Sequence, residues 1–89
     1  MTKQYYTDLV LEDRYIWAVD EEGRMTPLSH FSVSSTEGAT YPTEIVIQPE
    51  SGAPWHSKHK FSAEELPSEL ERISALQNRW IELSRVVLN

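Results

Sequence analysis

The apolar residues change their spacing at Ser62, and this change constrains the fold more than any other feature of the chain. From there they recur every three or four positions, which is the spacing of one face of an α-helix. The stripe consists of Leu66, Leu70, Ile73, Leu76, Trp80, Leu83 and Val87. Ser62 and Glu65 have the spacing of a capping box, and Pro67 suits the first position of a helix. We therefore expect a short turn over 62–66 and one long helix over about 67–87.

The preceding residues have the spacing of β-strands. Apolar and aromatic residues alternate over 14–19, and the stretch "DEEG" that follows is a plausible tight loop, because Gly23 readily adopts left-handed conformations. The return strand runs to Val33 and contains Pro27, which cannot donate a ladder hydrogen bond and so indicates an edge or a bulge. We expect further strands over 5–11, with Tyr5, Thr7, Leu9 and Leu11 on one face, and over 43–49. A polar loop is expected over 34–42.

These elements predict a single α+β domain spanning 1–89. The chain of 89 residues is long enough for one hydrophobic core, and it contains no internal repeat. We expect a small twisted antiparallel sheet of three to four strands, packed against the C-terminal helix. An alternative use of the helix is a homodimer, because Leu66, Ile73, Trp80 and Val87 are seven residues apart. Apolar residues off the stripe would add to such a contact, namely Ile81, Val86 and Leu88.

Composition excludes several classes of protein. There is no cysteine, which rules out disulfides, zinc fingers and thiol chemistry. No apolar run approaches the ~20 residues that cross a membrane, and the start lacks the apolar segment of a secretory signal. We expect a cytoplasmic protein that begins at Met1. The chain also lacks a phosphate-binding loop, a dinucleotide fingerprint and a nucleophile elbow, so we expect neither an enzyme nor a bound cofactor.

The stretch "APWHSKHKF", residues 53–61, combines histidines, lysines and aromatic residues. In an extended segment His56 and His59 point to opposite sides, so we expect no metal site. The same alternation puts Lys58 and Lys60 on the face opposite Trp55, whereas single-strand nucleic-acid binders present cations and aromatic rings together. We interpret this segment, called the basic strip below, as a strand or an amphipathic connector that is anchored by Trp55 and Phe61. Weak nucleic-acid binding through Trp55, His56, Lys58 and Lys60 remains an alternative.

Acidic residues are the remaining candidates for a site. The formal net charge is −6, and the first 23 residues are the most acidic part of the chain. Carboxylates on an exposed loop can occupy a groove lined with arginine and lysine in place of phosphates. The candidate partner-binding residues are Asp20, Glu21, Glu22, Glu12 and Asp13. A second acidic set on the helix, Glu64, Glu71 and Glu82, is explained by the helix dipole and by ion pairs along the helix.

We therefore predict a small, acidic, non-enzymatic regulator or inhibitor that binds a protein with a basic surface. The favoured version blocks the basic groove of a nucleic-acid-handling protein. Phage-encoded inhibitors, anti-CRISPR and anti-restriction proteins among them, work in this way, although none of their motifs occurs here. The alternative is an adaptor or accessory subunit that binds through Trp55, Phe61 and the end of the helix.

Overall fold

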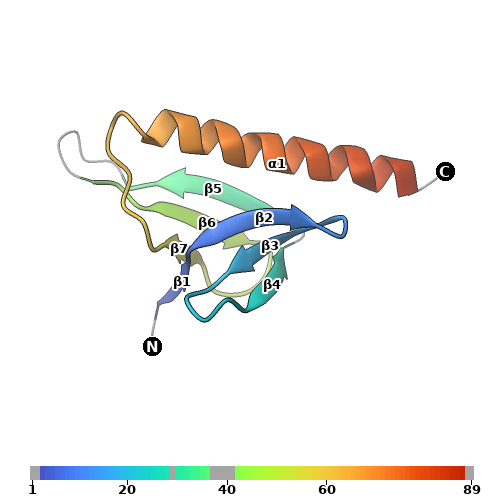
Figure 1. The fold of residues 1–89 in the computed structure, drawn as a ribbon, viewed down its shortest axis with the longest axis horizontal. Coiled ribbons are helices and arrows are strands. Elements are labelled where there is room, and N and C mark those ends of the chain that lie inside the picture. Colours follow the sequence, from blue (N-terminus) through green and yellow to red (C-terminus); the bar gives the residue numbers. More distant parts are fainter. Residues whose placement is uncertain (1–2, 29, 37–41, 88–89) are drawn as a thin grey trace.

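The computed structural model describes residues 3–28, 30–36 and 42–87, which form two β-sheets and one helix (Figure 1). One sheet has four strands in the order β1-β7-β6-β5, and the other has three in the order β2-β3-β4. The α+β class is confirmed, with the strands shared between two sheets. The elements are β1 (Gln4–Tyr6), β2 (Asp8–Glu12), β3 (Tyr15–Val19), β4 (Met25–Leu28), β5 (Phe31–Ser35), β6 (Ile45–Pro49), β7 (Trp55–Ser57) and α1 (Leu66–Val87).

The three-stranded sheet is an antiparallel meander. Tight connections join β2 to β3 and β3 to β4, and the "DEEG" stretch forms the second of them, with Gly23 at a φ of 82°. The first connection pairs Glu12 with Tyr15 across a two-residue loop. Both loop residues, Asp13 and Arg14, have positive φ, which matches the twist of a hairpin. Pro27 lies on β4 at the edge of this sheet, as its missing N–H predicts.

Two of the expected strands are each divided between the sheets. The expected strand over 5–11 breaks at Thr7, so that β1 belongs to one sheet and β2 to the other. Tyr6 and Leu9 are the buried residues, and the single face predicted for Tyr5, Thr7, Leu9 and Leu11 is wrong. The return strand divides in the same way, into β4 and β5. The alternation of buried and exposed residues starts again wherever the chain passes from one sheet to the other. A period-2 pattern read through such a point therefore assigns residues to the wrong face.

The four-stranded sheet is mixed. β6 pairs in antiparallel fashion with both β5 and β7, whereas β1 runs parallel to β7. A parallel pair needs a long connection, and here most of the protein separates the two strands. The polar loop expected over 34–42 begins later than predicted, because Ser34 and Ser35 belong to β5. Most of its remaining length, 37–41, lies outside the described residues.

The helix begins at Leu66, one residue before the predicted start, and ends at Val87. The capping box is present: Glu65 Oε1 accepts from the Ser62 N–H at 3.0 Å, and Ser62 Oγ accepts from the Glu65 N–H at 3.2 Å. Ile73 on the predicted stripe is fully buried, and Ile81 off the stripe is exposed. The side chains of Val86, Val87 and Leu88 lie outside the description.

The core lies where α1 packs across both sheets (Figure 1). Polar contacts to backbone carbonyls connect the helix to each sheet. Arg72 Nη1 donates to the Leu9 carbonyl on β2 at 3.1 Å, and Gln77 Nε2 donates to the Phe31 carbonyl on β5 at 3.0 Å. No helix in the described part of the chain is both long and apolar enough to span a membrane. The buried cluster consists of Tyr6, Leu9, Ala18, Leu28, Ile45, Ile47 and Ile73.

Candidate partner-binding site

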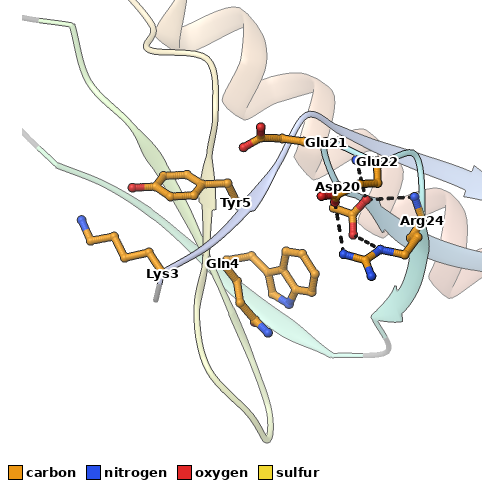
Figure 2. A pocket seen from close by; sticks show the side chains of 8 residues that line it. Lys3, Gln4, Tyr5, Asp20, Glu21, Glu22 and Arg24 are labelled. Carbon is orange, nitrogen blue, oxygen red and sulfur yellow. Dashed lines mark hydrogen bonds and ion pairs between the residues drawn. The ribbon is translucent and has the colours of Figure 1, made fainter. Parts of the chain in front are cut away.

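A pocket of about 420 Å³ lies between β1 and the loop that joins β3 to β4 (Figure 2). We call it the β1 pocket. On the strand side it is lined by Lys3, Gln4 and Tyr5, with Trp55 from the neighbouring β7. On the loop side it is lined by Asp20, Glu21, Glu22 and Arg24. The pocket therefore brings together the acidic loop and Trp55 of the basic strip, which the sequence treats as separate candidates.

Asp20 holds the loop in shape. Its carboxylate accepts hydrogen bonds from the backbone N–H groups of Glu22 (3.0 Å) and Arg24 (2.9 Å), and from Arg24 Nε (2.9 Å). Desolvation alone would raise the pKa of Asp20, but the hydrogen bonds from Arg24 and its positive charge outweigh this effect and lower it. With three donors in place, the Asp20 carboxylate fixes the conformation of the loop.

Glu21 and Glu22 are the accessible carboxylates of the loop, with side chains 52% and 67% exposed. Glu22 forms an ion pair with Arg24 Nη2 at 3.1 Å, and Glu21 forms one with Lys58 Nζ at 3.3 Å. Exposed ion pairs of this kind contribute only about 0–1 kcal/mol. A cation from another molecule can therefore replace either internal partner at little cost.

Tyr5 contributes an aromatic face that the sequence does not associate with the strip. Residue 5 pairs with His56 in the parallel ladder, and Lys58 Nζ lies 5.4 Å from the centre of the Tyr5 ring. The lysine thus sits between an aromatic ring and the Glu21 carboxylate, an arrangement that favours an ammonium group. The ring beside Lys58 comes from the neighbouring strand β1 and not from the strip itself. Only the pairing of two distant segments places Tyr5 here.

The rest of the basic strip serves the protein's own structure. Glu44 accepts from His56 Nδ1 at 2.8 Å and from Lys60 Nζ at 2.6 Å. The Glu44 side chain is only 12% exposed, and the hydrogen bond from Lys60 is the main reason that the pKa of this carboxyl is lowered. His59 faces a different carboxylate, Glu65, at 3.7 Å. The role of Glu44 could not be predicted from the sequence, because an isolated acidic residue just before a strand gives no signal of its partners.

The two histidines of the strip therefore approach separate carboxylates. Among residues 3–28, 30–36 and 42–87, no three histidine or acidic side chains are grouped so that they could hold a metal ion.

Glu12 and Asp13 lie away from the β1 pocket. Glu12 is the last residue of β2 and Asp13 is the first of the turn between β2 and β3, whereas the Asp20 loop follows the opposite end of β3 (Figure 1). Five strand residues separate the two turns, which corresponds to about 17 Å. The structure therefore joins three of the five predicted acidic residues into one site and leaves the other two at a distance.

Comparison with known proteins adds no assignment, since no family model, curated protein or solved structure matches this chain.

Proposed function

We propose that this protein is a non-enzymatic regulator or inhibitor that binds a protein partner at the β1 pocket, by accepting basic side chains. The observation that carries the proposal is the arrangement around Lys58. An ammonium group of the chain itself is placed between the Tyr5 ring and the Glu21 carboxylate, at the edge of the pocket. A lysine or arginine of a partner would find the same two favourable contacts.

The overall charge supports a basic partner. A protein of net charge −6 attracts cationic surfaces and speeds association with them, and it repels nucleic acid. The basic groove of a nucleic-acid-handling protein is a partner of this kind. Direct binding of nucleic acid by the basic strip has less support, because the whole chain is acidic and Lys60 already pairs with the largely buried Glu44.

The test is to neutralise the two accessible carboxylates, using the partner recovered from the native host. Glu21→Gln combined with Glu22→Gln should weaken binding about tenfold at low salt, because charge-assisted contacts are lost. The matched control is Glu64→Gln with Glu71→Gln, which makes the same change in net charge at exposed positions of the α1 region. Asp20 is kept, because its replacement would disturb the loop itself.

Calorimetry at two salt concentrations completes this test. Binding at the pocket should weaken steeply between low and physiological salt, since the contacts are exposed to screening ions. Equal affinity of the two double variants would contradict the proposal.

A second candidate function rests on an apolar surface at the other end of the molecule. Tyr15 is 50% exposed and Ile81 is 42% exposed, and beside Tyr15 lies a pocket of about 290 Å³ that Trp80 and Leu83 also line. An adaptor or accessory subunit could bind there. Its affinity would barely respond to salt, which separates it from the first candidate. Trp55 and Phe61, by contrast, are partly buried against the core.

A further inference from the structure

Each of the two sheets ends in two edge strands. An edge strand presents backbone N–H and C=O groups that have no partner within the sheet, and proteins usually cover or block them. The edges here are β1 and β5 in one sheet, and β2 and β4 in the other. The edge whose outward backbone groups have no partner indicates where a strand from another molecule can pair with the sheet.

The three-stranded sheet has both edges partly protected. On β2 the outward groups of Leu9 are satisfied on both sides: its N–H donates to Asp8 Oδ1 at 2.8 Å, and its carbonyl accepts from Arg72 at 3.1 Å. On β4 the Asp20 N–H donates to the Arg24 carbonyl, so residues of even number face β3 and Pro27 faces outward. Proline has no N–H to offer, which blocks this edge.

The β5 edge is partly covered by the helix. The outward carbonyl of Phe31 accepts from Gln77, and His30 just before the strand stacks edge-on against Trp80, with ring centres 5.2 Å apart. The helix therefore crowds the beginning of this edge. Val33 is the next residue along the strand whose backbone faces outward.

The β1 edge is different. The Lys58 N–H donates to the Tyr6 carbonyl at 2.8 Å, so Tyr6 directs its backbone toward β7. Residues alternate in a parallel ladder, and the N–H and C=O of Tyr5 must therefore point away from β7. Within the described part of the chain no hydrogen bond involves these two groups. Tyr5 also lines the β1 pocket, which leaves space beside this edge.

We propose that an extended basic segment of the partner pairs with β1 and extends the four-stranded sheet. The inference rests on the proposed function and specifies how the partner binds. Backbone hydrogen bonds to Tyr5 would align the segment, and alternate side chains would point to the same face. A lysine or arginine on that face would reach Glu21 and Glu22, whose carboxylates lie across the pocket from β1 (Figure 2). Charge complementarity thus favours a basic segment over an acidic one.

Amide hydrogen exchange measured by NMR tests this pairing on the intact protein. The probe is a synthetic peptide of about nine residues in which lysine alternates with threonine, and the control peptide has glutamate in place of lysine. With the lysine peptide at millimolar concentration, the Tyr5 amide should exchange at least about tenfold more slowly, because its N–H gains an acceptor. The glutamate peptide should leave the exchange rate of Tyr5 unchanged.

Two variants separate the backbone of Tyr5 from its ring. Tyr5→Ala removes the ring, whereas Tyr5→Pro removes the ring and the outward N–H but no hydrogen bond to β7. Tyr5→Pro should bind the lysine peptide more weakly than Tyr5→Ala by about tenfold. If the proline variant does not fold, the exchange rate in the unmodified protein still decides the question.

The outcomes distinguish this inference from the function on which it rests. Resonance shifts at Glu21 and Glu22 with unchanged exchange at Tyr5 would refute strand addition and leave the charged site standing. Slower exchange at Val33 in place of Tyr5 would move the added strand to β5 and refute the inference. The absence of any shift at these residues would count against both proposals.

Discussion

Tyr5 and Tyr6 are neighbours in the chain, yet their side chains have opposite surroundings. The Tyr5 ring faces the β1 pocket and Lys58, whereas Tyr6 is only 3% exposed within the core. The Tyr6 hydroxyl has no hydrogen-bond partner among the described residues. Its burial, and next the charge of Glu69, raise the pKa of Tyr6 well above its ordinary value. A buried hydroxyl without a partner destabilises the fold.

Tyr6→Phe should therefore leave the free energy of unfolding unchanged or raise it by about 1 kcal/mol. The pH dependence follows from the raised pKa. Below the unfolded-state value of about 10 the hydroxyl is protonated in both states, and above it the unfolded chain alone gains from ionisation, so stability falls as the pH rises. Urea unfolding measured at about pH 8 and about pH 11 should show that the free energy of unfolding falls less for the variant than for the parent protein. A variant less stable than the parent by 1 kcal/mol or more would mean that the hydroxyl has a partner.

At the scale of elements, the two tight turns of the three-stranded sheet both require residues with a positive φ. The β2–β3 turn has only two residues, Asp13 at a φ of 49° and Arg14 at a φ of 68°. Left-handed backbone costs residues with a Cβ roughly 1–2 kcal/mol, and glycine avoids that cost. Asp13, proposed from the sequence as a binding residue, therefore has a role in the turn itself. The "DEEG" loop meets the same requirement with a glycine at position 23.

Arg14→Gly should stabilise the protein by about 1 kcal/mol, because glycine accepts the positive φ without strain. Chemical denaturation would measure this gain as a higher midpoint. Arg14→Ala is the control, since it removes the same side chain and keeps the strained conformation. Equal stability of the glycine and alanine variants would show that the turn is not strained.

For the whole molecule, three carboxylates in different regions have lowered pKa values. The pKa of Glu44 is lowered chiefly by the hydrogen bond from Lys60, and that of Glu65 by the backbone N–H of Ser62. Desolvation acts to raise the pKa of Asp20, but the hydrogen bonds from Arg24 and its charge lower it overall. These groups join β6 to the strip, cap the helix and shape the β3–β4 loop. Each contributes stability above the unfolded-state pKa of about 4, and that contribution is lost as the pH falls through the lower folded-state value.

The melting temperature should therefore fall as the pH is lowered from about 5 to about 3. Glu44→Gln should cost about 1–2 kcal/mol at neutral pH, because the side chain is largely buried and bonded to a charged group. The variant should also lose less stability on acidification, since it lacks one of the three carboxylates. Parallel melting curves for variant and parent across this pH range would argue against a contribution from Glu44.

Much of the fold could be predicted where the signal is local. The helix was expected within one residue of its observed start, and the capping box, the turn at Gly23 and the edge position of Pro27 are confirmed. The number of sheets could not be predicted, because a strand that leaves one sheet for another keeps its composition and changes only its partner. Only part of the candidate site could be proposed from the sequence. Its loop acids and Trp55 were named, whereas Tyr5 was not.

The sequence alone determined the helix and the tight turns, since periodicity, caps and turn residues act within a few positions of one another. Tertiary structure decided what those elements face. The pairing of β1 with β7 joins residues 4–6 to 55–57, and it alone places Tyr5 beside Lys58 and Trp55. It also places the Glu21 carboxylate against Lys58, 37 positions along the chain. Contacts between segments so far apart depend on how the whole core packs, and no local pattern of residues encodes them.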